Sequence, residues 1–153
     1  MRSTPPADDP LRGIYYAALD IEGAVVEVFG DSERLIDPGS FRLVRLSLVE
    51  PLRLLDLRGR GGMVAGPTAG ISGTENRALT QAWARFFYDR SDLYTSIDGV
   101  RYANSHNQLD AIAVFERGEH AIACARQFQI RLADPSLEPT LLRIAERNNL
   151  VLN

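Results

Sequence analysis

The chain has 153 residues, of which 45% are hydrophobic and 24% are charged, proportions that are typical of one soluble globular domain. The single cysteine, Cys124, excludes an internal disulfide, and His106 and His120 are too few for a typical zinc site, so no metal is expected. No stretch approaches the ~18 apolar residues of a membrane span, and the chain start lacks the apolar core of a signal peptide. These features predict a cytoplasmic protein that does not contact a membrane.

The charge pattern and the missing motifs exclude several functions. The formal charge of −3 at pH 7 comes from 17 basic and 20 acidic residues without a long run of one sign, which argues against direct binding of nucleic acid. All basic residues are arginines, which excludes a lysine Schiff base and a Walker lysine, and we attribute this bias to genome composition. The sequence also lacks the GxSxG, HExxH, CxxC and GxGxxG motifs.

The chain begins with an expected extended or disordered segment over residues 1–12, because its first ten positions hold three of the eight prolines. Residues 14–18 are typical of a short strand, and Asp20 can cap a helix that ends near Gly30. The apolar positions of this helix follow the i, i+3, i+4, i+7 rule: Ile21, Ala24, Val25 and Val28. Glu27 is set off this apolar stripe, so its carboxylate need not enter the core.

The middle of the chain predicts two strands, a loop and a second helix. Alternation over residues 41–49 and an apolar run over residues 52–57 are typical of strands. Residues 59–73 contain six of the twelve glycines, which predicts a flexible surface loop or a loop that lies over a ligand. A helix is expected over residues 74–90, with one buried face formed by Ala78, Leu79, Ala82, Trp83, Phe86 and Phe87.

The last part of the chain predicts strands over residues 99–103, 111–116 and 124–132, and a helix over residues 135–147. Strands outnumber helices and come in adjacent runs. The sequence therefore predicts an α+β fold, in which a single domain over residues 13–153 has a mainly antiparallel or mixed sheet flanked by helices.

The segment DGVRYANSHN is unusually polar for the end of a strand. Loops that follow strands present functional side chains from a rigid frame, and asparagine and serine also form hydrogen-bonded turns. The residues alone leave both interpretations open.

Several motifs taken together resemble the RES domain family. The run IYYAALDIEGAVVEVFGD is similar to its opening strand and helix, and RALTQAWARFFYD, DGVRYANSHN and AIAVFER follow in the family's order. The ending LADPSLEPTLLRIAERNNL is similar to its C-terminal helix. The resemblance covers most of the chain from about Gly13 onward.

The resemblance implies a fold related to ADP-ribosyltransferases and a toxin, paired with an antitoxin, that destroys NAD. The motif glutamate falls on Glu27 and the site tyrosine on Tyr16, whereas Tyr15 should face the other side of the strand. The motif serine falls on Ser105 or, one position earlier, on Asn104, and only Ser105 has a hydroxyl. The resemblance implies that Tyr16, Asn104 and Ser105 bind NAD and that Glu27, Tyr16 and Ser105 take part in the chemistry.

The chain departs from the family pattern at the arginine, which belongs before the first strand. Only Arg2 and Arg12 precede that strand, and neither matches the pattern well. An arginine there would hold the pyrophosphate of NAD. Without the resemblance, Glu27 reads as a solvated carboxylate, Tyr16 as a core residue and Ser105 as a turn residue.

The expected reaction breaks the bond between nicotinamide and ribose, and a carboxylate can stabilise the cationic sugar that forms. The sequence does not choose between water, phosphate and a protein side chain as the acceptor, so glycohydrolase, phosphorylase and ADP-ribosyltransferase remain open, as does a binding module without turnover. NAD is then the substrate, and no cofactor is expected. The expected partner is an antitoxin, and the sequence is compatible with a homo-oligomer.

Overall fold

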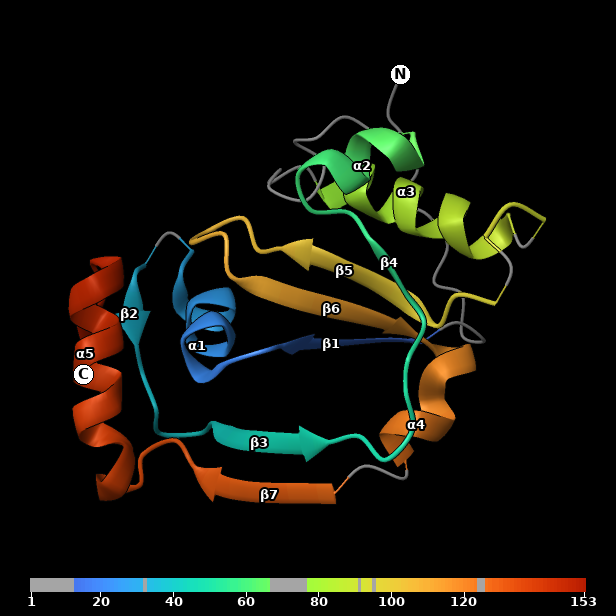
Figure 1. Ribbon diagram of the computed structural model, residues 1–153. Coiled ribbons are helices and arrows are strands. Elements are labelled where there is room, and N and C mark those ends of the chain that lie inside the picture. Colours follow the sequence, from blue (N-terminus) through green and yellow to red (C-terminus); the bar gives the residue numbers. More distant parts are fainter. Residues whose placement is uncertain (1–12, 32, 67–76, 91, 95, 124–125) are drawn as a thin grey trace.

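The computed structural model of the protein describes residues 13–31, 33–66, 77–90, 92–94, 96–123 and 126–153 (Figure 1). The expectation for residues 1–12 and the expected helix start at Thr74 lie outside these ranges. Among the described residues, no helix is long and apolar enough to cross a membrane.

A four-stranded sheet forms the centre of the molecule, with the strand order β1-β6-β5-β4. These strands are β1 (Ile14–Ala18), β4 (Leu54–Asp56), β5 (Gly99–Ala103) and β6 (Asp110–Phe115). Strand β6 runs antiparallel to both β1 and β5, whereas β4 runs parallel to β5, so the sheet is mixed. Together with the helices, this sheet confirms the predicted α+β class.

Helices α2 (Arg60–Ala65) and α3 (Arg77–Asp89) lie on one side of this sheet (Figure 1). Trp83 and the fully buried Phe87 of α3 pack with residues of β5 and β6. The buried members of this sheet core are Leu57, Ala65, Phe87, Val100, Ala113 and Phe115. The expected burial is confirmed for Phe87, but the prediction is wrong for Ala82 and Phe86, which are exposed.

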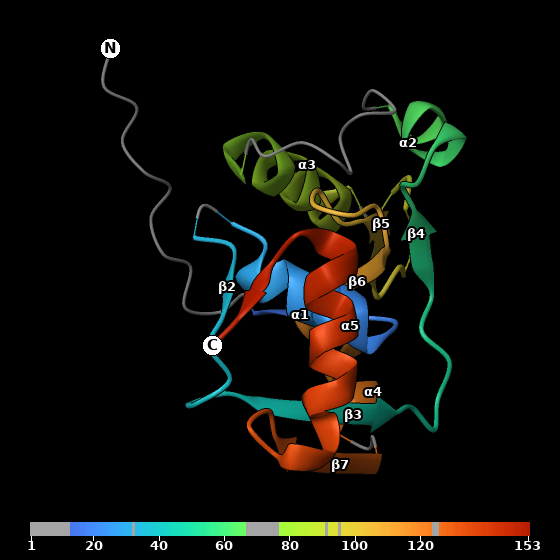
Figure 2. The same ribbon diagram turned by 90° about the vertical axis from the view of Figure 1, so that its left-hand side faces the viewer.

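A second core joins α1 (Ile21–Phe29) to α5 (Glu138–Asn148) and to a parallel pair of short strands, β2 (Leu35–Ile36) and β8 (Val151–Leu152). Figure 2 shows α5 in front of α1. The buried members of this helix core are Val25, Val26, Ile36, Leu132, Leu141, Ile144, Ala145 and Leu150.

The helices of the second core end at the residues that the sequence indicates. Asp20 caps α1, since its Oδ1 accepts the amide of Gly23 at 2.7 Å. Asn149 adopts the left-handed conformation that ends α5, with φ of 53°.

An antiparallel ribbon of β3 (Arg42–Ser47) and β7 (Arg126–Arg131) lies on the side of the central sheet opposite α2 and α3 (Figures 1 and 2). Helix α4 (Glu119–Ala123) precedes β7, and two 3₁₀ turns span Glu116–Gly118 and Pro135–Leu137.

The glycine-rich segment is the main departure from the expected fold, because residues 60–65 form helix α2 rather than a loop. Gly61 reflects a close approach rather than flexibility, since a Cβ there would lie 2.1 Å from the carbonyl oxygen of Asp56. The phenol of Tyr94 donates to the carbonyl of Ala65 at 2.8 Å and so holds the end of this helix. The sequence analysis also missed β2, α4 and β8, which have two to five residues each.

Candidate functional site

Two tyrosines lie on the face of the central sheet that packs against α3. Tyr16 in β1 is directly opposite Ala113 in β6, which is directly opposite Val100 in β5. Because side chains alternate along a strand, Tyr102 shares this face with Val100, and Tyr15 points to the other face as expected. The Tyr16 side chain is 58% exposed, so it is not an ordinary core residue.

Glu27 lies on the face of α1 that approaches the sheet and the turn after β5. The spacing of Gly23, Glu27 and Gly30 places them on one face of the helix. A Cβ at Gly23 would lie 3.2 Å from Cβ of Ala18, and a Cβ at Gly30 would lie 3.0 Å from the ring of His106. Glycine therefore lets α1 approach closely on both sides of Glu27, which itself remains exposed.

Tyr102 of β5 interacts electrostatically with both Glu27 and Tyr16. Burial raises the pKa of its phenol well above the usual range, and the negative charge of nearby Glu27 raises it further, with a smaller effect from Tyr16. The Tyr102 hydroxyl is therefore protonated at neutral pH and can donate a hydrogen bond. The sequence analysis did not single out Tyr102, although its place two residues after Val100 on an alternating strand is a signal that could have found it.

The turn after β5 carries Asn104 and Ser105. Asn104 is 1% exposed, and its Oδ1 accepts the amides of His106 at 2.9 Å and Asn107 at 3.0 Å, so this side chain shapes the turn. Its Nδ2 is buried without a hydrogen-bond partner among the described residues. Ser105 is half-buried, and its hydroxyl makes no hydrogen bond with the part of the chain that the structure describes.

Charged residues on the opposite face of the sheet form an ion-pair network. Arg58 donates to Asp56 at 2.6 Å and to Asp110 at 2.6 Å, and Arg101 also pairs with Asp110. The hydrogen bond from Arg58 lowers the pKa of Asp56 to about 2, and hydrogen bonds from Arg58 and Arg101 lower the pKa of Asp110. This network stabilises β4, β5 and β6, and it is separated from Tyr102 by the sheet.

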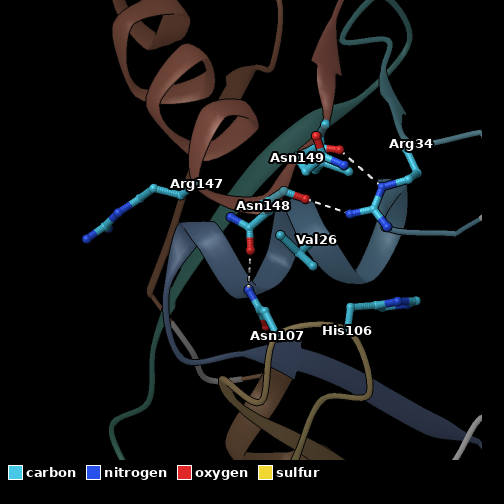
Figure 3. Close-up of a pocket in the computed structure, with 9 residues that line it drawn as sticks. Val26, Arg34, His106, Asn107, Arg147, Asn148 and Asn149 are labelled. Carbon is cyan, nitrogen blue, oxygen red and sulfur yellow. Dashed lines mark hydrogen bonds between the residues drawn. The ribbon is translucent and has the colours of Figure 1, made fainter.

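A cavity of about 380 Å³ lies between the C-terminal ends of α1 and α5 (Figure 3). Polar side chains line most of it, and the most prominent are Arg34, His106, Asn107, Arg147 and Asn148. The cavity contains neither Tyr16 nor Glu27, but it borders the turn that carries Ser105. Nε2 of His106, one of the residues that line the cavity, lies 3.7 Å from Oδ1 of Asp31.

Four of the expected site residues thus come from three neighbouring elements: β1, α1 and the turn after β5. The two arginines considered for the pyrophosphate, Arg2 and Arg12, lie outside the described residues. The described residues contain no group of three or more histidine, cysteine, aspartate or glutamate side chains that could hold a metal ion.

Comparison with known proteins gives one match. The model of the RES domain family matches residues 7–138, so the match includes Arg12, Tyr16, Glu27 and Ser105 and ends at the start of α5. No curated protein and no solved structure matches the chain. The match supports, at the level of the family, a role related to NAD and to toxin–antitoxin pairs. Since it covers most of the chain, the protein belongs to the RES domain family.

Proposed function

We propose that the protein is a toxin that cleaves the bond between nicotinamide and ribose in NAD. The observation that carries this proposal is the exposed carboxylate of Glu27, which lies within electrostatic reach of Tyr102 and has no cationic partner among the described residues. A carboxylate that is exposed and pairs with no cation in the described ranges is available to a ligand. Membership of the RES domain family adds NAD as the substrate class.

The chemistry requires stabilisation of positive charge rather than a strong nucleophile. When the glycosidic bond breaks, its electron pair leaves with neutral nicotinamide, and the ribose becomes an oxocarbenium-like cation. The Glu27 carboxylate can accept hydrogen bonds from the ribose hydroxyls and stabilise this cation. Water or phosphate then bonds to the same ribose carbon, and an attacking water releases its proton to solvent.

The side chains near Glu27 can orient NAD in the candidate site. The exposed ring of Tyr16 can stack on the nicotinamide, and the Ser105 hydroxyl can bind the ribose or the nicotinamide amide. Asn104 can contact the ligand only through Nδ2, because its Oδ1 is used within the turn. Arg12, unlike Arg2, lies within the family match, so we propose Arg12 as the arginine that binds the pyrophosphate.

We also propose that an antitoxin covers this site. The glycine-rich segment 59–73 is the candidate rim for that contact, and its described part, α2, packs on the same sheet face as Tyr102. Met63 and Val64 of α2 are 65% and 81% exposed, which is unusual for apolar side chains and supports a protein contact there.

The test is nicotinamide release from NAD by the purified protein, with and without inorganic phosphate. We expect Glu27→Gln to lower the rate by at least about 100-fold, because the neutral amide cannot stabilise the cation. Glu146→Gln, a change of the same kind at an exposed position of α5, should stay within about twofold of the wild type.

Each outcome has a defined meaning. Release that requires phosphate identifies a phosphorylase, and release in its absence identifies a glycohydrolase. ADP-ribose attached to a protein, detected by mass spectrometry, would identify a transferase instead. A wild type without release would refute the proposed function, and a Glu27→Gln variant as active as the wild type would refute the role of Glu27 in it.

A further inference from the structure

The C-terminal end of α5 connects the two elements that carry Glu27 and Ser105. The Nδ2 of Asn148 donates to Oε1 of Glu22 in α1 at 2.9 Å, and its Oδ1 accepts a hydrogen bond from Nδ2 of Asn107 at 3.2 Å. Figure 3 shows Asn148 above Asn107, with the dashed line between their amides. One side chain thus bridges segments that are 126 and 41 positions away in the sequence.

Both ends of this bridge lead directly to the candidate site. Glu22 precedes Glu27 by five residues on α1, so it fixes the helix that carries the carboxylate. Asn107 follows Ser105 by two residues, and its Oδ1 accepts the amide of Leu109 at 3.3 Å. The turn is therefore a bonded unit, and a displacement of Asn107 would move Ser105 with it.

Asn148 is itself held in place. Its Nδ2 also donates to the carbonyl of Ile144 at 2.9 Å, and the Arg34 guanidinium donates to the carbonyls of Asn148 at 2.7 Å and Asn149 at 3.1 Å. Arg147 donates to Oε2 of Glu22 at 3.2 Å. Because its polar lining groups bond to one another, we interpret the cavity as a seam between α5, α1 and the turn rather than as a ligand pocket.

We propose that Asn148 is a positioning residue, which sets the Ser105 turn against α1 and so fixes the distance between Ser105 and Glu27. The inference rests on the proposed function for its effect on turnover. Asn148 lies beyond residue 138, where the family match ends, whereas its partners Glu22 and Asn107 lie within the match. A misplacement of about 1 Å at catalytic groups can reduce a rate by up to about 100-fold, so a bridge of this kind affects turnover without touching substrate.

The first test compares Asn148→Ala with Glu146→Ala on the same helix. We expect Asn148→Ala to lower kcat/KM for NAD about 10-fold, and Glu146→Ala, whose side chain is exposed, to change it less than about twofold. Asn107→Ala breaks the same bridge from the turn and should reproduce the loss. It therefore replaces Asn148→Ala if that variant does not fold.

A double-mutant cycle with Ser105 separates positioning from a general loss of structure. If Asn148 acts through the turn, its removal should cost less than about twofold in a Ser105→Ala background, because the group that it positions is gone. The same 10-fold loss in both backgrounds would overturn the proposal, and so would full activity of Asn148→Ala.

Hydrogen exchange distinguishes a failure of this proposal from a failure of the proposed function. Asn148→Ala should speed exchange of the Asn107 and Leu109 amides by about tenfold or more, while the amides of β6 keep their wild-type protection. Unchanged exchange in the turn would overturn the proposal whatever the activity. An inactive wild type would refute NAD cleavage and the effect on turnover, and the exchange would still decide whether Asn148 holds the turn.

Discussion

The Tyr102 hydroxyl stays protonated far above neutral pH, because burial and the charge of Glu27 both raise its pKa. The Tyr102 phenol and the Glu27 carboxylate, which pairs with no cation in the described part of the chain, give the candidate site one hydrogen-bond donor and one acceptor. Tyr102 belongs at the same time to the sheet core around Phe87, which holds its ring. The ring of Tyr102 thus packs against the sheet core, while its hydroxyl can donate a hydrogen bond to a ligand.

We predict that Tyr102→Phe lowers kcat/KM for nicotinamide release by up to about 10-fold, the effect of one neutral hydrogen bond, without unfolding the protein. The loss should be equal at about pH 7 and about pH 9, since the raised pKa keeps Tyr102 protonated at both values. Tyr15→Phe removes a hydroxyl from the opposite face and should have no effect. Equal activity of both variants would exclude Tyr102 from the site.

Sequence patterns named single candidate site residues but not their partners. Tyr16, Glu27 and Ser105 belong to local motifs, so the printed sequence is sufficient to name them. The electrostatic interaction of Tyr102 with Glu27 and the bridge at Asn148 join segments that are far apart in the chain, and no local periodicity in the sequence encodes such long-range pairs.

At the scale of elements, the predictions were confirmed where a local sequence pattern is long enough to define the element, and they were missed where it is too short. Strand β5 matches the predicted residues 99–103, and β6, a continuous apolar run, differs from its prediction by one residue at each end, because both patterns are typical of strands. Strands β2 and β8 have two residues each, which is too short for any period. Helix α2 was missed because glycine usually weakens helices, and here close packing against Asp56 requires it.

The network around Arg58 predicts how the edge of the sheet responds to acid. The pKa of Asp56 is about 2 in the folded protein and 3.8 without its partners, so its contribution to stability is complete above about pH 4 and is lost as the pH falls toward 2. Arg58→Gln should therefore lower the urea midpoint at neutral pH, and the difference from wild type should shrink below about pH 4.

Two controls accompany this prediction. Arg143→Gln removes a guanidinium that, within the described ranges, bonds only to the Thr140 hydroxyl, and it should show no such pH dependence. The Arg58 and Asp56 side chains are 33% and 49% exposed, so high salt should also reduce the effect of Arg58→Gln. A difference that persists unchanged at about pH 2.5 would mean that Arg58 stabilises the sheet by packing.

At the scale of the whole molecule, α1 joins two cores that would otherwise be separate. Its buried valines pack against α5 in the helix core, while its glycine face contacts β1 and the turn after β5. The site therefore forms only where both cores are folded, since Glu27 comes from one and Tyr102 from the other. We expect the two cores to unfold in one cooperative transition.

Leu150 offers a direct test, because it closes the helix core and lies beyond the family match. Its side chain is 8% exposed, so we predict that Leu150→Ala lowers the free energy of unfolding by about 2–4 kcal/mol. Leu142→Ala makes the same change at a position of α5 that is 52% exposed and should cost less than about 1 kcal/mol.

The single tryptophan, Trp83, lies in the sheet core and reports on the other end of the molecule. If α1 couples the cores, the urea transition followed by Trp83 fluorescence should shift as far as the one followed by circular dichroism. A shift in circular dichroism alone would show that the helix core unfolds by itself, and Glu27 would then leave the site while Tyr102 stays in place.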